Sequence, residues 1–206
     1  MLRIYGRTNS INVQKVMWTV GELGLAHERI DAGGTFGGLD TEEYGRLNPN
    51  RKIPTLVDGD VVVWESNAIV RYLAARYGAG SLWPADPAAR SFADRWMDWQ
   101  LAELLPLLHP IFWNLVRTPP EKRDMTAVER ASRAIGPLWR ILDEWLAQRR
   151  FVAGEQLTMG DIPLGCAFWR YRNLDIQRPP LPHLERWFGE LSARPAYRQH
   201  VMLPVT

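Results

Sequence analysis

The apolar residues in the first third of the chain alternate between the spacing of strands and the spacing of helices. Leu2–Tyr5 and His27–Ile30 are short runs of β-forming residues, and each predicts a strand. Between them, apolar side chains recur three and four positions apart and stop at Gly24, which predicts a helix that carries Val13, Val16, Met17, Val20 and Leu23. The chain is therefore expected to begin as a βαβ unit.

The next segment predicts a helix, a hairpin and another helix. A glycine-rich loop at 33–38 leads into a short helix over Asp40–Leu47. Thr55–Val57 and Val61–Val63 flank Asp58-Gly59, a dipeptide typical of tight hairpin turns. After the hairpin, Ile69, Tyr72 and Leu73 recur at helical spacing and predict the apolar face of another helix, which would end at Gly78.

The second half of the chain contains no predicted strand. It follows a stretch rich in glycine, proline and small residues at 79–87, which is typical of a linker. Long helices are expected over Ala88–Val116 and Thr126–Arg149, with possible bends or weak points at Pro106, Pro110 and Pro137.

The end of the chain adds shorter helices. Thr158–Asp161 matches a capping box ahead of an apolar run, and Pro163 within that run should remove a backbone hydrogen bond. His183–Ser192 predicts a final short helix. The second half is thus expected to be all-helical.

Composition narrows the classes of function. The 206 residues are 46% hydrophobic and 23% charged, as expected for a globular protein. The net charge is only +2 and the sequence has no polybasic block, so a nucleic-acid partner is not expected. The lone Cys166 excludes an internal disulfide and favours a reducing, cytoplasmic setting. No apolar stretch is long enough for a membrane span, and the four histidines lack metal-ligand spacing, so neither membrane nor metal is expected.

Two neighbouring motifs carry the chemistry. Ile53-Pro54 starts a predicted strand, where a proline cannot donate to the sheet. If this bond is cis, the backbone of Ile53 points outward and leaves a free strand edge. Glu65-Ser66 opens the following helix, whose N-terminus attracts anions. An extended, anionic, peptide-like ligand would suit both features.

In order and spacing, these motifs resemble the cytosolic glutathione transferase family, in particular its theta-type and bacterial members. The resemblance covers the whole chain and rests on Ser10–Val16, Asn48–Leu56, Glu65–Ile69 and Thr158–Asp161. It implies an α/β plus all-α fold. A thioredoxin-like domain (βαβαββα) would span 1–78, a linker 79–87 and an all-helical domain 88–206. It also implies a homodimer, with glutathione as co-substrate.

The resemblance further implies which residues hold glutathione. Ser66 would bind the γ-glutamyl carboxylate and Glu65 the ammonium. The alternative is that Ser66 caps its helix, and the two roles can coexist. Ile53 would pair with the cysteinyl backbone, and Lys52 would meet the glycine carboxylate, with Arg51 as a weaker candidate. Leu39 aligns where related members carry a histidine for the glycine end.

The activating group is expected just before the first helix. Ser10 is the principal candidate for a hydrogen bond to the glutathione thiolate, with Asn12 and Thr8 as alternatives, and Ser10 or Asn12 could instead be only a helix cap. A bond to a charged acceptor contributes about 1.5–3 kcal/mol, which would lower the thiol pKa by about one to two units. No general base is required.

The electrophile would bind against the helical half. The candidate wall consists of aromatic and polar residues expected on the first helices of that half: Trp96, Trp99, Gln100, Glu103, Trp113 and Arg117. Phe36, in the glycine-rich loop, would form the rim of the pocket. The function implied is conjugation of glutathione to a small apolar electrophile. Alternatives are an isomerase, dehalogenase or peroxidase on the same fold, or a non-catalytic binding protein. Thr8-Asn9-Ser10 lacks the Ser-Ser-Cys run of the isomerases.

Overall fold

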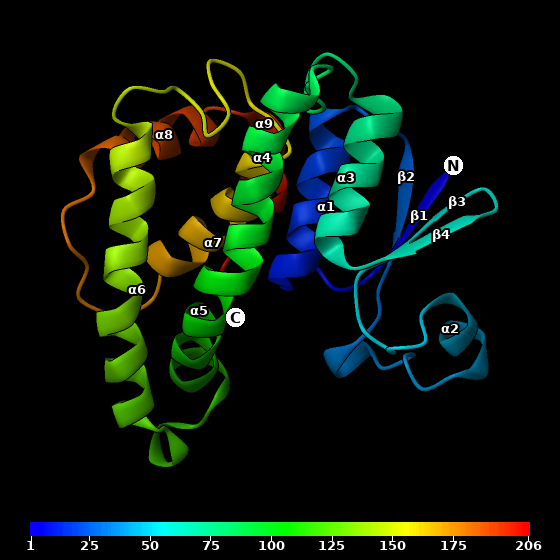
Figure 1. The fold of residues 1–206 in the computed structure, drawn as a ribbon. Helices are drawn as coiled ribbons and strands as arrows, with labels where there is room; N and C mark the ends of the chain where they lie inside the picture. The colour runs from blue at the N-terminus through cyan, green and yellow to red at the C-terminus, as the bar shows by residue number, and fades with distance from the viewer.

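The computed structural model describes residues 1–206 and shows an α/β half joined to a helical half (Figure 1). The α/β half follows the predicted order, with a short 3-10 turn η1 (Gly34–Phe36) added in the glycine-rich loop. Its elements are β1 (Leu2–Tyr5), α1 (Ile11–Glu22), β2 (His27–Ile30), α2 (Glu42–Leu47), β3 (Thr55–Asp58), β4 (Val61–Trp64) and α3 (Ser66–Tyr77). The predicted fold class is confirmed.

The four strands form one mixed sheet in the order β2-β1-β3-β4. β1 pairs with β2 in parallel and with β3 antiparallel, and β3 and β4 form the predicted hairpin. Helices α1 and α3 lie between the sheet and the helical half, whereas α2 is set apart from them (Figure 1). Because β1 and β4 are both antiparallel to β3, the loops that lead from them into α1 and α3 start at the same end of the sheet.

The core of the α/β half forms where α1 and α3 cover the sheet. Val13, Val16 and Val20 of α1 pack with Ile4 of β1 and Leu56 of β3, and all are buried. The turn between β1 and α1 needs a glycine, because a Cβ atom on Gly6 would lie 2.4 Å from a Val13 methyl group. This close approach brings the start of α1 to its place beside the sheet edge.

The helical half begins with a continuous helical rod rather than one regular helix. It consists of α4 (Pro87–Trp99), a π-helical turn η2 (Gln100–Leu104), α5 (Leu105–Phe112) and a second π-helical turn η3 (Trp113–Arg117). Pro106 and Pro110, the predicted bend points, both fall in α5 between the two π turns. A proline removes a backbone donor, and π turns are a recognised way to accommodate such a local mismatch.

The remaining helices are α6 (Met125–Leu146), α7 (Asp161–Arg172), α8 (Pro182–Ser192) and α9 (Pro195–His200), with a 3-10 turn η4 (Pro120–Lys122) before α6. α6 continues through Pro137. α9 was not predicted. The expectation that Pro163 costs a backbone bond is wrong, because Pro163 is the third residue of α7 and amides in the first turn have no partner within the helix.

Asp161 ties the start of α7 to two other parts of the helical half. Its buried carboxylate accepts hydrogen bonds from the Thr158 amide (2.9 Å), which is one half of the predicted capping box, and from the Thr158 hydroxyl (3.2 Å). The reciprocal half is not formed, because the Asp161 amide donates to the Thr158 carbonyl and Gly160 is the N-cap of α7. It also accepts from the Val152 amide (3.0 Å) and from Trp187 Nε1 on α8 (2.9 Å). The predicted motif therefore organises the centre of the helical half as well as one helix end.

The two halves share a packed boundary along α1. Trp18 on α1 is fully buried and meets α7 at Gly165, where an added Cβ atom would lie 2.7 Å from the indole ring. On the other side of the boundary, Arg71 of α3 forms ion pairs with Asp94 and Asp98 of α4. None of the helices is long and apolar enough to cross a membrane.

Candidate active site

A cavity of about 170 Å³ opens where the start of α1 faces α5 and η3. We call it the cleft. On the α/β side, the cleft is formed by the loop before α1 and by the first turn of α1. On the helical side, it is formed by residues of the helical rod and by one residue of α7. The lining residues are Arg7, Asn9, Ser10, Ile11, Asn12, Leu105, Leu108, His109, Phe112, Trp113, Arg117 and Arg170.

The structure places two of the three candidate activating residues in the cleft. Ser10 directly precedes α1, and its hydroxyl makes no capping hydrogen bond. Asn12 lies in the first turn, and its Oδ1 accepts a hydrogen bond from Ser66 Oγ at 3.2 Å. Thr8 is exposed and does not line the cleft. Ser10 and Asn12 therefore retain free donors beside the cleft, and Thr8 is not among its walls.

Glu65 and Ser66 form the start of α3 in an unusual backbone conformation. Glu65 has φ 68° and ψ 114°, outside the regions that a residue with a side chain ordinarily adopts. Such a conformation costs about 1–3 kcal/mol and is found preferentially at functional sites. Ser66 follows as the first residue of α3 and is buried, with its hydroxyl close to α1.

The Ile53-Pro54 peptide bond is cis, as the sequence motif led us to expect. Ile53 itself is half-buried, and the exposed Lys52 precedes it. The Lys52 carbonyl accepts hydrogen bonds from Tyr44 Oη (2.7 Å) and Asn48 Nδ2 (2.9 Å). The sequence did not reveal these two contacts, in which side-chain donors hold the backbone immediately before Ile53 in place.

Arg51, the weaker candidate for the glycine carboxylate, makes hydrogen bonds within the protein. Its Nη1 donates to the carbonyls of Leu39 and Thr41, both at 2.9 Å. The guanidinium thus holds the loop before α2 in place. Leu39, the residue expected at the position of a histidine in related members, belongs to this loop.

Lys15 is a site residue that the sequence reasoning missed. It lies inside the apolar helix α1, is 0% exposed and has no carboxylate partner. Its ammonium instead donates to Asn67 Oδ1 (3.2 Å), Gln100 Oε1 (3.1 Å) and Ser66 Oγ (3.5 Å). Burial lowers the pKa of Lys15 to about 8. A lysine within an apolar run was the signal available in the sequence.

Arg170 is a second buried cation, at the helical side of the cleft. It is 8% exposed, its Nη2 donates to the Asn9 carbonyl at 3.2 Å, and its guanidinium lies 4.0 Å from the centre of the Phe112 ring. Burial lowers its pKa to about 10. Cys166, one turn earlier in α7, is fully buried, and burial raises its thiol pKa to about 12, so it is no nucleophile.

The predicted electrophile wall is only partly formed by the predicted residues. Trp113 and Arg117 line the cleft. Trp96 is buried in the helical core against Trp99 (ring centroids 5.0 Å apart) and Trp145 (5.8 Å), because the apolar face of α4 packs inward. The remaining candidates also lie outside the cleft lining: Trp99 packs on that core, Gln100 is buried against Lys15, and Glu103 and Phe36 are exposed.

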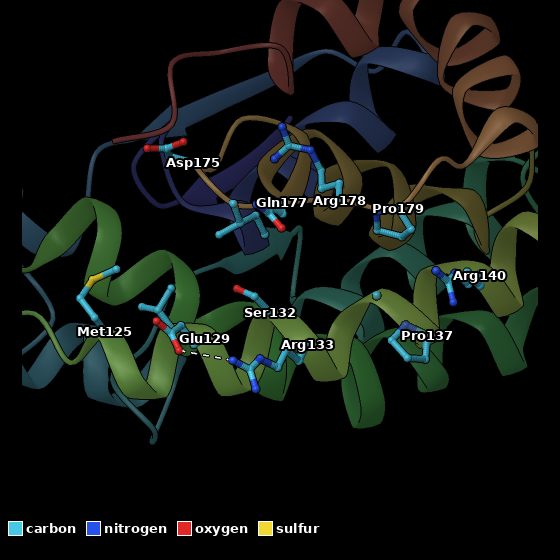
Figure 2. A pocket seen from close by; sticks show the side chains of 13 residues that line it. Met125, Glu129, Ser132, Arg133, Pro137, Arg140, Asp175, Gln177, Arg178 and Pro179 are labelled. Atoms are coloured by element: carbon cyan, nitrogen blue, oxygen red, sulfur yellow. Dashed lines mark ion pairs between the residues drawn. The ribbon is translucent and has the colours of Figure 1, made fainter.

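A larger cavity of about 700 Å³ lies elsewhere, between α6 and the segment 175–179 (Figure 2). Its rim carries the Glu129–Arg133 ion pair, at 3.6 Å. It shares no residue with the cleft or with the two motifs at Ile53 and Glu65. Size alone therefore does not identify the active site.

The fold joins an α/β half, with a cis-proline at the start of β3 and a strained residue before α3, to a helical half that closes the cleft. Residues 1–75 match the model of the glutathione S-transferase N-terminal domain, and residues 104–195 match that of the C-terminal domain. The chain belongs to the glutathione S-transferase family, and the resemblance inferred from the motifs is confirmed.

Two similar proteins place the chain among bacterial members. It is 41% identical to glutathione S-transferase GstB of Escherichia coli over the full length of both chains. It superposes on the theta class glutathione S-transferase of Xanthomonas axonopodis pv. citri with glutathione bound at a TM-score of 0.96 and 46% identity, covering 100% and 99% of the two chains. With the apo form of that protein the TM-score is 0.86 at 40% identity.

Lys15 should contribute positive charge next to Ser66, the residue that we expect to bind the γ-glutamyl carboxylate. We expect Lys15→Met to weaken binding of S-methylglutathione by about tenfold at about pH 7, measured by calorimetry. Because the ammonium loses its proton near its lowered pKa, the affinity of the native protein for S-methylglutathione should fall as pH rises from about 7 to 9. The decline caused by Lys15 should be absent from the variant. Lys122→Met, on the exposed turn η4, is the control. Equal affinity and pH profile in native protein and Lys15→Met would refute the role.

Proposed function

We propose that the protein conjugates glutathione to a small electrophile at the cleft and that each motif holds one part of the tripeptide. Ser66 and the α3 N-terminus bind the γ-glutamyl carboxylate, and Glu65 binds the ammonium. The backbone of Ile53 pairs with the cysteinyl unit, and Lys52 meets the glycine carboxylate. Membership of the family supports glutathione as the co-substrate.

One observation carries this proposal: the hydrogen bond between Ser66 Oγ and Asn12 Oδ1. It joins the proposed glutathione clamp, formed by Glu65 and Ser66, to the helix start that carries the candidate activating groups. A tripeptide held by the clamp and by Ile53 would then place its thiol beside Ser10. The positive end of α1 and a hydroxyl donor at that point favour the thiolate, so no base has to remove the proton during the reaction.

Ser10 is the proposed activating donor, and Asn12 is the alternative. Asn12 uses its Oδ1 toward Ser66, which leaves its amide nitrogen free to donate. Both groups border the cleft, in contrast to Thr8. The electrophile would bind in the cleft against Trp113.

We also propose a homodimer that acts in the cytoplasm and removes reactive electrophiles. The dimer is supported by β4, an edge strand whose Val61, Val62 and Trp64 side chains are exposed. Exposed apolar side chains on an edge strand are typical of a surface that a partner covers. The single buried Cys166 is consistent with a reducing compartment.

Binding to the clamp distinguishes a glutathione-dependent enzyme from a non-catalytic protein with the same fold. We expect the native protein to be retained on immobilised glutathione and the double variant Glu65→Ala/Ser66→Ala to lose at least about tenfold in affinity, because two charge-assisted contacts disappear. Glu42→Ala, on the exposed face of α2, is the matched control. Failure of the native protein to bind would favour the non-catalytic alternative.

The activation step has its own test. In the complex with glutathione, Ser10→Ala should raise the apparent thiol pKa by about one to two units if Ser10 donates to the thiolate. The ultraviolet absorbance of the thiolate, titrated against pH, measures this value, and Asn12→Ala provides the comparison. A rise only in Asn12→Ala would transfer the role to Asn12, and unchanged values in both would leave helix capping as their function.

The dimer predicts a solution mass of twice the 23.7 kDa chain. Val62→Lys should shift sedimentation toward the monomer, because it adds charge to the exposed face of β4. Ile141→Lys, at an exposed position on α6, should leave the mass unchanged. A monomeric native protein would refute the dimer without affecting the active-site proposal.

A further inference from the structure

The cleft is lined by three arginines and by no acidic residue. Arg7 comes from the loop before α1, Arg117 from the end of η3, and Arg170 from α7. None of them takes part in an ion pair, although nine such pairs occur elsewhere in the protein. Three separate elements therefore bring uncompensated positive charge to one small cavity.

These guanidinium groups are close enough to disfavour one another. Burial and then the charge of Arg117 lower the pKa of Arg7, and both Arg117 and Arg7 add to the effect of burial on the pKa of Arg170. Like charges gathered without a counter-charge destabilise the folded protein. An anion in the cleft would relieve this repulsion.

Arg170 makes the strongest case for a bound anion. It is nine-tenths buried, yet only one of its donors has a protein acceptor, the Asn9 carbonyl. A buried cation is expensive unless it is paired and hydrogen-bonded. The stacking of its guanidinium on Phe112 holds it in place, so its remaining donors are oriented before any ligand arrives.

Apolar and aromatic residues next to the arginines suit a planar apolar group. Trp113 is 52% exposed and stacks on His109, with ring centroids 5.5 Å apart and an angle of 18° between the planes. Leu105, Leu108 and Phe112 complete an apolar wall. A flat ring could lie against Trp113 while an acidic substituent on it reaches the arginines.

We propose that the electrophile of this enzyme is an aromatic compound bearing a carboxylate, with Arg7, Arg117 and Arg170 as the residues that determine this specificity. The inference rests on the proposed function and replaces the expectation of a purely apolar electrophile. Glutathione's own carboxylates are assigned to Ser66 and Lys52 on other elements, so the arginines are available to the second substrate.

The reaction with a suitable probe needs no further reactant. In para-chloro-meta-nitrobenzoate, the glutathione thiolate attacks the ring carbon that bears chlorine and forms a carbon–sulfur bond. The carbon–chlorine bond then breaks, and its electron pair leaves with chloride. The proton that the thiol lost earlier goes to water. The ring carboxylate takes no part in these bond changes and serves only for binding.

The test compares this benzoate with the corresponding benzamide, which has the same shape and leaving group but no charge. Each kcat/KM is divided by the uncatalysed rate constant of the same compound with glutathione. We expect the native enzyme to favour the benzoate by about 10- to 100-fold, the range of one or two charge-assisted hydrogen bonds. Arg117→Met and Arg7→Met should each remove most of this preference, and Arg117→Lys should retain part of it.

The same variants separate this role from a role in activating the thiol. If the arginines stabilised the thiolate instead, Arg117→Met would slow both compounds equally and raise the thiol pKa of bound glutathione, and the proposal would be overturned. Arg130→Gln, an exposed position on α6, controls for net charge. Turnover of the benzamide without preference for the benzoate would overturn this inference alone, whereas a failure to bind glutathione at all would overturn the proposed function.

A binding measurement avoids dependence on turnover. The unreactive meta-nitrobenzoate should bind to the complex with S-methylglutathione about 10- to 100-fold more tightly than meta-nitrobenzamide, and Arg117→Met should abolish the difference. Equal affinity of the two compounds for the native complex would also overturn the inference.

Discussion

The active site is organised around a buried ammonium that has no anionic partner. Lys15 lies on α1, which packs against the helical half, and it donates to side chains at the start of α3 and in the π turn η2. Because a buried charge strongly disfavours any unpaired arrangement, these three acceptors must remain in place. The relative positions of α1, α3 and the helical rod are thereby fixed, and the cleft, whose walls come from α1 and that rod, takes its shape from the same boundary.

Much of the fold could be predicted because it depends on local periodicity and on turn residues. The strands, the hairpin at Asp58-Gly59 and the capping box at Thr158–Asp161 all follow from neighbours in the sequence. The π turns on either side of α5 and the short helix α9 did not, since they have no distinct sequence pattern. Pro163 illustrates a different limit: its effect depended on where α7 begins, and a difference of one turn makes the missing amide harmless.

The candidate site was predictable where it consists of backbone and helix ends, and less so where side chains from several helices meet. Glu65 and Ser66 lie at the start of α3 as expected, and Glu65 has the strained backbone typical of functional positions. The helical wall was harder, because helical spacing alone does not reveal which face of α4 points inward. Trp96 faces the core, whereas Arg170 reaches the cleft from α7, far along the chain. Neither assignment could be made before the helices were packed.

The positive charge of the cleft exceeds what activation of a thiol can use. Lowering the thiol pKa increases the thiolate fraction only until the pKa approaches the ambient pH. Below that point each further unit reduces the nucleophilicity of the sulfur by a factor of about three, since the Brønsted coefficient is about 0.4–0.5. The proposed hydroxyl donor and the N-terminus of α1 would already supply the useful shift. If the charge of Arg7, Arg117 and Arg170 acted on the thiolate as well, it would slow the attack. That charge is better used on an anionic group of the second substrate, where it strengthens binding and holds the reacting carbon near the sulfur without weakening the nucleophile.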